Sequence, residues 1–186
     1  MKDIIKERIL VLDGALGTII QQYGLTEADF RGEEFKNHPV KLEGNNDILV
    51  LTRPDIISNI HRQYLEAGAD IIETCTFNSQ AISQTEYQTT DFVYRINLEA
   101  ARLARQEADC MTALTPDKPR FVAGSVGPTA KMTSMSPDVE NPALRAVDYD
   151  TLCKAYVEQM EALMEGGVDA LLIETIFDTL NAKAAL

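Results

Sequence analysis

Short apolar runs alternate along the chain with longer segments in which apolar residues recur at helical spacing. Four runs, at residues 9–12, 70–75, 120–125 and 169–174, are too short for helices and too uninterrupted for half-exposed antiparallel strands. Strands of a parallel sheet that is covered on both faces have this pattern. The sequence therefore predicts an α/β fold of about four βα units, with the four runs as parallel strands.

Helices are predicted between these strands. In the first of them, Thr52 offers a capping hydroxyl, Pro54 suits the first turn and Gly68 suits a left-handed C-cap. A last helix is expected from about residue 177 to 186. The apolar faces of the other helices are formed by Ile56, Ile57, Ile60 and Tyr64; by Phe92, Val93, Ile96, Ala100, Leu103 and Ala104; and by Leu152, Ala155, Tyr156, Leu163 and Met164.

A repeated segment and the loop lengths indicate where a site would lie. EAGADIIET at 66–74 recurs as EGGVDALLIET at 165–175, and each copy gives a helix end, a glycine turn and a strand that ends on a carboxylate. The connections that leave strands, 14–51 and 126–149, are long, whereas the return at 68–69 is short. Long loops at the carboxyl ends of parallel strands form the ligand sites of barrels and doubly wound sheets, so we expect the site there.

The composition limits the kinds of partner. The chain has 186 residues, 45% of them hydrophobic, which suits one globular domain. Its formal net charge of −12, without a dense basic run, makes nucleic acid and anionic membranes poor partners. No apolar stretch approaches the roughly 20 residues that cross a bilayer, and the start is too charged for a signal peptide, so a cytoplasmic location is expected.

Acidic residues mark three of the four predicted strand ends. If the strands are parallel, Asp13, Glu73 and Glu174 share one rim, where a buried carboxylate needs a partner such as a ligand ammonium. Each carboxylate could instead cap a helix N-terminus or hold an arginine, and Asp13 could serve only an Asp-Gly turn. Three acids at equivalent positions favour a functional role for the set.

Two glycine segments, 14–17 and 124–127, follow strands and could present backbone N–H groups to an anion. Neither has the lysine of a phosphate loop or the pattern GxGxxG, so nucleotide binding is weakly supported. Cys75 lies at the end of a predicted strand, where a plain buried thiol is a simpler interpretation than a nucleophile or metal ligand. The three cysteines are widely spaced, which favours reduced thiols.

Several motifs, in order, resemble those of the homocysteine S-methyltransferase family. The resemblance rests on DGALGT at 13–18, EAGADIIETCTFN at 66–78, GSVGP at 124–128 and IETIFDTLN at 173–181. FRGEEF at 30–35 and LEGNNDILVLT at 42–52 are similar to the amino-terminal module of cobalamin-dependent methionine synthases, rather than to the betaine or S-methylmethionine branches.

The resemblance implies a (βα)8 TIM barrel that binds homocysteine at its carboxyl-end rim, with the thiolate on a zinc ion held by three cysteines. In the cobalamin-dependent branch, methylcobalamin methylates homocysteine to methionine and 5-methyltetrahydrofolate recharges the cobalamin. Cys75, Cys110 and Cys153 do not match the family's zinc ligands, so neither zinc nor cobalamin is expected on this chain. Residues 1–186 are expected to form the N-terminal half of the barrel, truncated at its C-terminal end. The other half and the folate and cobalamin modules are its expected partners.

Five substrate-binding residues follow from the resemblance. Asp13 and Glu174 match positions near the amino group of homocysteine, whereas Thr74, Asn78 and Ser125 match positions that line the pocket around its carboxylate. Glu73 is left out, because neighbouring side chains on a strand point to opposite faces.

No catalytic residue and no metal ligand is assigned, so the half barrel alone is expected to be inactive. Two alternatives are a cobalamin-independent methyltransferase that uses betaine or S-methylmethionine, and a non-catalytic half-barrel binding or assembly module. Open strand edges also predict self-association.

Overall fold

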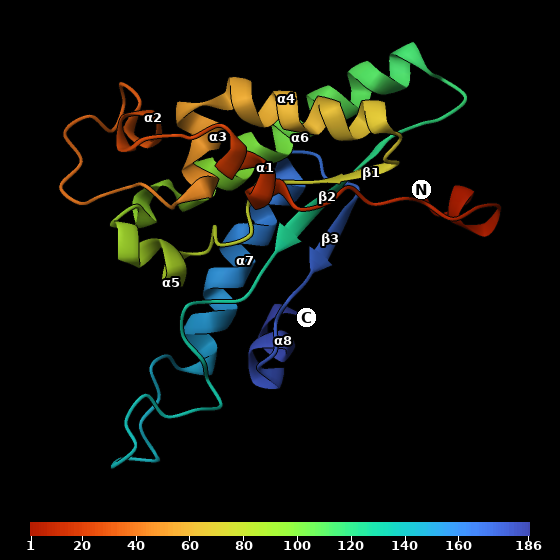
Figure 1. Ribbon diagram of the computed structural model, residues 1–186. Helices are drawn as coiled ribbons and strands as arrows, with labels where there is room; N and C mark the ends of the chain where they lie inside the picture. Colours follow the sequence, from red (N-terminus) through yellow and green to blue (C-terminus); the bar gives the residue numbers. More distant parts are fainter.

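The computed structural model describes residues 1–186 and contains a three-stranded parallel sheet in the order β1–β2–β3 (Figure 1). The strands are β1 (Ile71–Glu73), β2 (Phe121–Val126) and β3 (Ala170–Ile173). Ile72 pairs with Val122, and Ser125 pairs with Leu172. The parallel pairing and the alternation of helix and strand confirm the predicted α/β class.

A long helix precedes each strand, and a short helix follows β1 and β3. The helices are α1 (Leu16–Gln22), α2 (Glu27–Arg31), α3 (Leu49–Thr52), α4 (Pro54–Ala67), α5 (Ala81–Gln84), α6 (Val93–Leu114), α7 (Tyr149–Glu165) and α8 (Thr179–Ala185). Single 3₁₀ turns lie at Ile4–Lys6, Asn46–Ile48, Thr85–Tyr87 and Thr90–Phe92. The predicted loop at 14–51 therefore contains three short α-helices, whereas 127–148 contains none.

The predicted first strand is only partly formed. Residues 9–12 run parallel to β1, but they contribute one isolated bridge, between Leu12 and Ile71, so the sheet has three strands rather than four. The Asp13 N–H donates to the Ile71 carbonyl (2.9 Å) and the Asp70 N–H to the Val11 carbonyl (2.8 Å). The segment pairs only with the β1 side, and Ile9 is 87% exposed. Without a second neighbouring strand and without burial, the segment does not form a longer strand.

An ion pair fastens this N-terminal segment to the start of β1. The Arg8 guanidinium donates to both carboxylate oxygens of Asp70, at 2.9 and 2.7 Å, and the Val11 N–H donates to the same carboxylate. The hydrogen bond from Arg8 is the main cause that lowers the pKa of Asp70 to about 2. Because Asp70 is almost fully buried, this charge is held in place by paired donors rather than by water.

The ends of α4 agree with the prediction except at the N-cap. Pro54 occupies the first turn, and Gly68 follows the helix in the left-handed region at φ +112°. Thr52 does not cap α4, because it is the last residue of α3 and its hydroxyl lies 3.5 Å from the Ile48 carbonyl. The N-cap is Arg53, which makes no side-chain capping bond.

Two boundaries near the C-terminus also differ from the prediction. Met164 is 56% exposed, so it lies outside the buried face of α7. The last helix begins at Thr179 rather than 177, because the Asp178 carboxylate accepts from the N–H groups of Leu180 and Asn181 and so caps it there.

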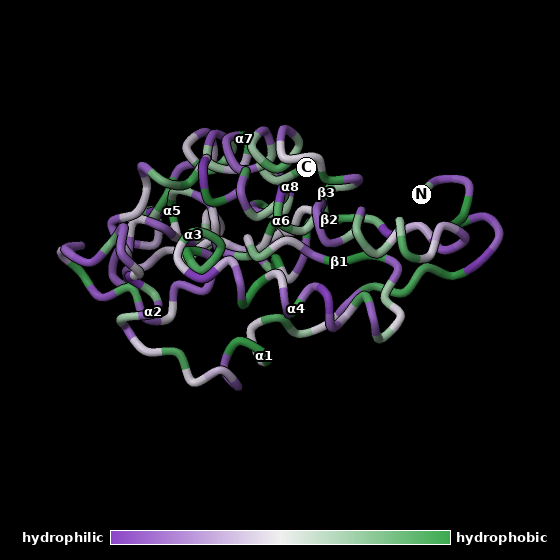
Figure 2. Tube along the Cα trace, turned by 90° about the horizontal axis from the view of Figure 1, so that it is seen from above, coloured by the Kyte–Doolittle hydropathy of each residue, from purple (hydrophilic) through white to green (hydrophobic).

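The helices cover the sheet unequally. α6 packs against both α4 and α7, and Figure 1 shows these three helices around the sheet while α8 follows β3. All six residues of β2 are buried, whereas the four residues of β3 are only partly buried. Figure 2 shows the contrast between the hydrophobic α3 and the mainly hydrophilic α2. None of the helices combines the length and apolar character that a membrane crossing requires.

The close approach of Gly127 to Phe77 gives a test of this packing. A Cβ at Gly127 would lie 2.3 Å from the Phe77 carbonyl oxygen, so Gly127→Ala should lower the free energy of unfolding by about 1–3 kcal/mol through overpacking. Gly17→Ala is the matched control, because its Cβ would lie 3.7 Å from the nearest side-chain atom and alanine favours α1. Urea unfolding measures both variants, and equal stabilities would contradict the assigned contact.

Candidate functional site

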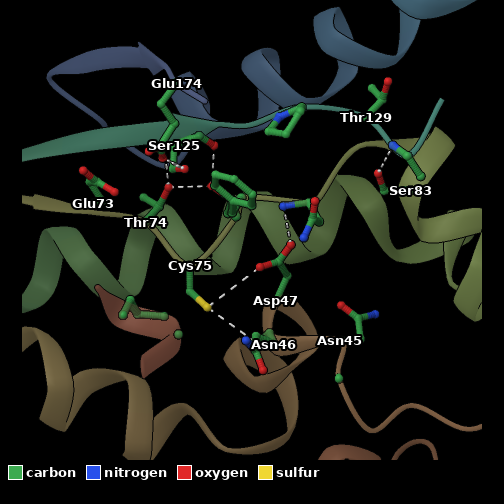
Figure 3. Close-up of a pocket in the computed structure, with 18 of the residues that line it drawn as sticks. Asn45, Asn46, Asp47, Glu73, Thr74, Cys75, Ser83, Ser125, Thr129 and Glu174 are labelled. Atoms are coloured by element: carbon green, nitrogen blue, oxygen red, sulfur yellow. Dashed lines mark hydrogen bonds between the residues drawn. The ribbon is translucent and has the colours of Figure 1, made fainter. Parts of the chain in front are cut away.

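A cavity of about 550 Å³ opens at the carboxyl ends of the strands. Residues 14–17, 44–47, 73–78 and 128–130 line it together with Ser125 and Glu174, so the ends of all three strands and two of the long loops contribute. Figure 3 shows Glu73, Thr74, Ser125 and Glu174 close together, with Asn45, Asn46 and Asp47 on the opposite side. The site therefore lies where the loop lengths predict it.

Three carboxyl groups meet at one end of this cavity. Glu73 and Glu174 line it, and Asp13 lies directly before the turn of residues 14–17 that lines it. One oxygen of Asp13 accepts from the Glu73 N–H at 3.0 Å, whereas the other, Oδ1, is buried and has no hydrogen-bond partner. Glu73 points into the same space as Glu174. Its neighbour Thr74 lines the cavity as well, because β1 ends at Glu73 and the alternation of side chains does not extend to Thr74.

No positive charge balances this acidic group. The residues that line the cavity include no lysine, arginine or histidine, and none of the three carboxylates takes part in an ion pair. Burial raises the pKa of Asp13 to about 7, and the neighbouring Glu174 carboxylate contributes. Burial, followed by the charges of Glu174 and Asp13, raises the pKa of Glu73 to about 7. A cationic ligand group would relieve this repulsion.

The hydroxyls of Thr74 and Thr76 form a closed ring with the backbone of Ser125. The Ser125 N–H donates to Thr74 Oγ1 (2.9 Å), and Thr76 Oγ1 donates to the Ser125 carbonyl (2.8 Å). The two threonine oxygens lie 2.6 Å apart, and because the Thr76 proton is already used, Thr74 is the donor between them. The Ser125 hydroxyl in turn donates to Glu174 Oε1 at 2.5 Å. Both predicted hydroxyl residues therefore line the cavity with their protons directed to protein acceptors.

The donors that remain free are an amide and a turn of backbone. Asn78 is exposed, lines the cavity, and its side-chain amide has no hydrogen-bond partner in the protein. The N–H groups of residues 14–17 donate to no backbone carbonyl. Both can therefore bind an anionic group.

Asp47 was not singled out by the sequence. It lies just before the apolar residues of α3, is almost fully buried, and accepts from the Asn78 N–H at 2.8 Å. Burial raises its pKa to about 6. Its Oδ1 lies 4.0 Å from the Cys75 thiol, and burial raises the pKa of that thiol well above its usual value. Cys75 therefore lines the cavity as a protonated thiol, not as an activated nucleophile.

The three cysteines do not fit a zinc site. Cys75 is buried at the end of β1, Cys110 is exposed on α6 and Cys153 lies on α7. No group of three histidine, cysteine or acidic side chains is arranged to hold a metal ion. No step of thiol activation can be derived from these residues.

The raised pKa values predict how stability depends on pH. A carboxyl whose folded pKa lies above its unfolded value stabilises the fold at low pH, and Glu73 loses that contribution as pH rises from about 4.5 through 7. The free energy of unfolding should therefore fall over this range, and Glu73→Gln should reduce the fall by on the order of 1–3 kcal/mol. Glu86→Gln, at an exposed acid of the same cavity, is the control in chemical unfolding at several pH values. Parallel pH profiles for wild type and Glu73→Gln would refute the prediction.

Comparison with known proteins assigns the family. The model of the homocysteine S-methyltransferase family matches residues 10–186. The metallated form of the homocysteine methyltransferase MmuM from Escherichia coli aligns with a TM-score of 0.74 and 21% identity, over 98% of this chain and 59% of that one. Its oxidized form aligns with a TM-score of 0.71 and 22% identity, over 95% and 56%. The chain thus spans less than two thirds of the length of MmuM and shares its fold as a partial barrel. Because the family model extends over residues 10–186, this chain belongs to the homocysteine S-methyltransferase family.

Proposed function

We propose that this chain supplies the part of a methyltransferase pocket that holds the amino-acid end of homocysteine. The observation that supports this proposal is a group of three carboxyls, Asp13, Glu73 and Glu174, at one end of a cavity with no basic side chain. Free anion donors lie on the same cavity, at Asn78 and the turn of residues 14–17. A zwitterion needs this combination of acidic and donor groups.

The acidic end would bind the ammonium group. Glu174 lines the cavity and is oriented by the Ser125 hydroxyl, so it can accept a charge-assisted hydrogen bond from an ammonium. Asp13, whose buried Oδ1 lacks a partner, adds negative charge close to Glu174. Glu73 adds a third carboxyl beside them, although the resemblance did not assign it.

The substrate carboxylate would bind to the free donors. Backbone N–H groups of residues 14–17 and the Asn78 amide can share it, which keeps it apart from the carboxyls. Thr74 and Ser125 then support the pocket from behind, since their hydroxyl protons are directed to Thr76 and Glu174.

The methyl donor we propose is cobalamin, recharged from 5-methyltetrahydrofolate, as in methionine synthases. Support comes from segments 30–35 and 42–52, of which the second brings Asn45, Asn46 and Asp47 onto the cavity. Zinc ligands do not fit within these residues, so we place the sulfur-activating metal on a further part of the barrel, together with three cysteines. A cobalamin-independent donor is the alternative, and assays of the full-length enzyme with methylcobalamin, betaine and S-methylmethionine distinguish the two.

Calorimetry with homocysteine at neutral pH tests the pocket. We expect Glu174→Gln to weaken binding about ten- to a hundredfold, because a charge-assisted hydrogen bond contributes about 1.5–3 kcal/mol. The exposed Glu140→Gln is the control, and 4-mercaptobutanoate, which lacks the ammonium, should bind much more weakly than homocysteine. Equal affinities for the two ligands would rule out an ammonium clamp.

The half-exposed β3 edge and the exposed side chains of Ile9, Val11 and Leu12 also predict self-association. Sedimentation velocity at micromolar concentration should show dimers or larger species whose share increases with concentration. A monomer at every concentration would contradict this expectation.

A further inference from the structure

We propose that Gln159, on the outer helix α7, is a positioning residue that sets the geometry of Ser125 and, through it, of Glu174. This inference rests on the proposed homocysteine pocket for its ligand test. Gln159 does not line the cavity, but its amide reaches the ends of two strands from behind.

The amide of Gln159 joins the segment after β1 to the end of β2. Its Nε2 donates to the Thr76 carbonyl at 2.8 Å and lies 3.4 Å from the Ser125 carbonyl. The same Ser125 carbonyl accepts from the Thr76 hydroxyl. Gln159 therefore adds a third connection to the ring of Thr74, Thr76 and Ser125, and all four residues are almost fully buried.

The orientation of this amide is fixed by its surroundings. With the amide turned over, Oε1 would face two carbonyl oxygens, whereas as placed both of them meet an N–H group. The remaining oxygen, Oε1, is buried without a partner. A buried oxygen without a hydrogen-bond donor lowers the stability of the fold, so stability alone does not account for a glutamine at this position. A role in placing the groups that its amide contacts does account for it.

The connection continues to the acidic end of the cavity. Ser125 is held through its N–H by Thr74 and through its carbonyl by Thr76 and Gln159, and its hydroxyl donates to Glu174 Oε1. Moving the Ser125 backbone would move that hydroxyl and release the carboxylate of Glu174. Gln159 thereby acts on the proposed ammonium contact without touching the ligand.

Asn97 on α6 offers a matched control. It too is fully buried, its Nδ2 donates to the Ser79 and Val93 carbonyls, and its Oδ1 lacks a partner. Its hydrogen bonds support the same segment after β1, but none of them reaches Ser125. Asn97→Leu and Gln159→Leu therefore remove the same kind of bond from behind the same pocket.

The test compares the two variants by calorimetry, under conditions where circular dichroism shows both to be folded. The readout is the ratio of dissociation constants for 4-mercaptobutanoate and homocysteine, which reports the ammonium contact and does not change with overall stability. Gln159→Leu should lower this ratio about tenfold, since a misplaced carboxylate loses most of one charge-assisted hydrogen bond, whereas Asn97→Leu should keep the wild-type ratio. An unchanged ratio in Gln159→Leu overturns the proposal.

A measurement without ligand separates this inference from the proposed function. Hydrogen exchange by NMR should show faster exchange of the Ser125 amide in Gln159→Leu than in Asn97→Leu, by about tenfold or more. If wild type binds no homocysteine, the proposed function fails, and exchange alone decides the role of Gln159. Equal exchange at Ser125 in both variants then overturns it, and selective acceleration supports it.

Discussion

Negative charge without a protein counterion is the constraint on which this site depends. Parallel strands end at the same edge of a sheet, so acids that end successive strands approach one another. Burial and mutual repulsion raise the pKa values of Asp13 and Glu73 to about 7, which leaves the group partly protonated near neutral pH. The surrounding structure must hold these carboxyls in position although their interaction opposes folding.

A network of neutral hydrogen bonds provides that support. Ser125 takes part with its N–H, its carbonyl and its hydroxyl, and its partners come from the segment after β1, from α7 and from the end of β3. All but one of these groups are uncharged, so the network adds order without adding charge. This is why residues that contact no ligand in the proposed pocket are still expected to affect its selectivity.

The periodicity of the sequence was sufficient to predict the three strands of the sheet and the long helices. Strands β1, β2 and β3 and helices α4, α6 and α7 lie where the apolar runs and faces predict them, because burial of those faces also holds them in place. Residues 9–12 have the same apolar character, but a strand needs neighbours, and these residues have one only. That information is not local, so the sequence pattern could not supply it.

The cavity brings together most of the residues that the sequence singled out, and it adds one that the sequence analysis set aside. Thr74, Asn78, Ser125 and Glu174 all line one cavity, whereas Glu73 was excluded by an alternation rule that stops applying where β1 ends. Gln159 lies among Ala155, Tyr156 and Leu163 on the apolar face of α7, and this polar exception was the available signal. The directions in which the hydroxyls around Ser125 donate depend on which acceptors lie nearby in space, and the sequence pattern does not give this.

The ion pair between Arg8 and Asp70 also affects the acidic end of the cavity, because it anchors the segment that carries Asp13. The segment that ends in Asp13 is anchored to the fold by this one ion pair and a few backbone hydrogen bonds. Arg8 is partly exposed, so dissolved salt screens its side of the pair. Ionic strength therefore changes how firmly Asp13 is held beside the cavity, although the ion pair that salt screens lies at the other end of this segment.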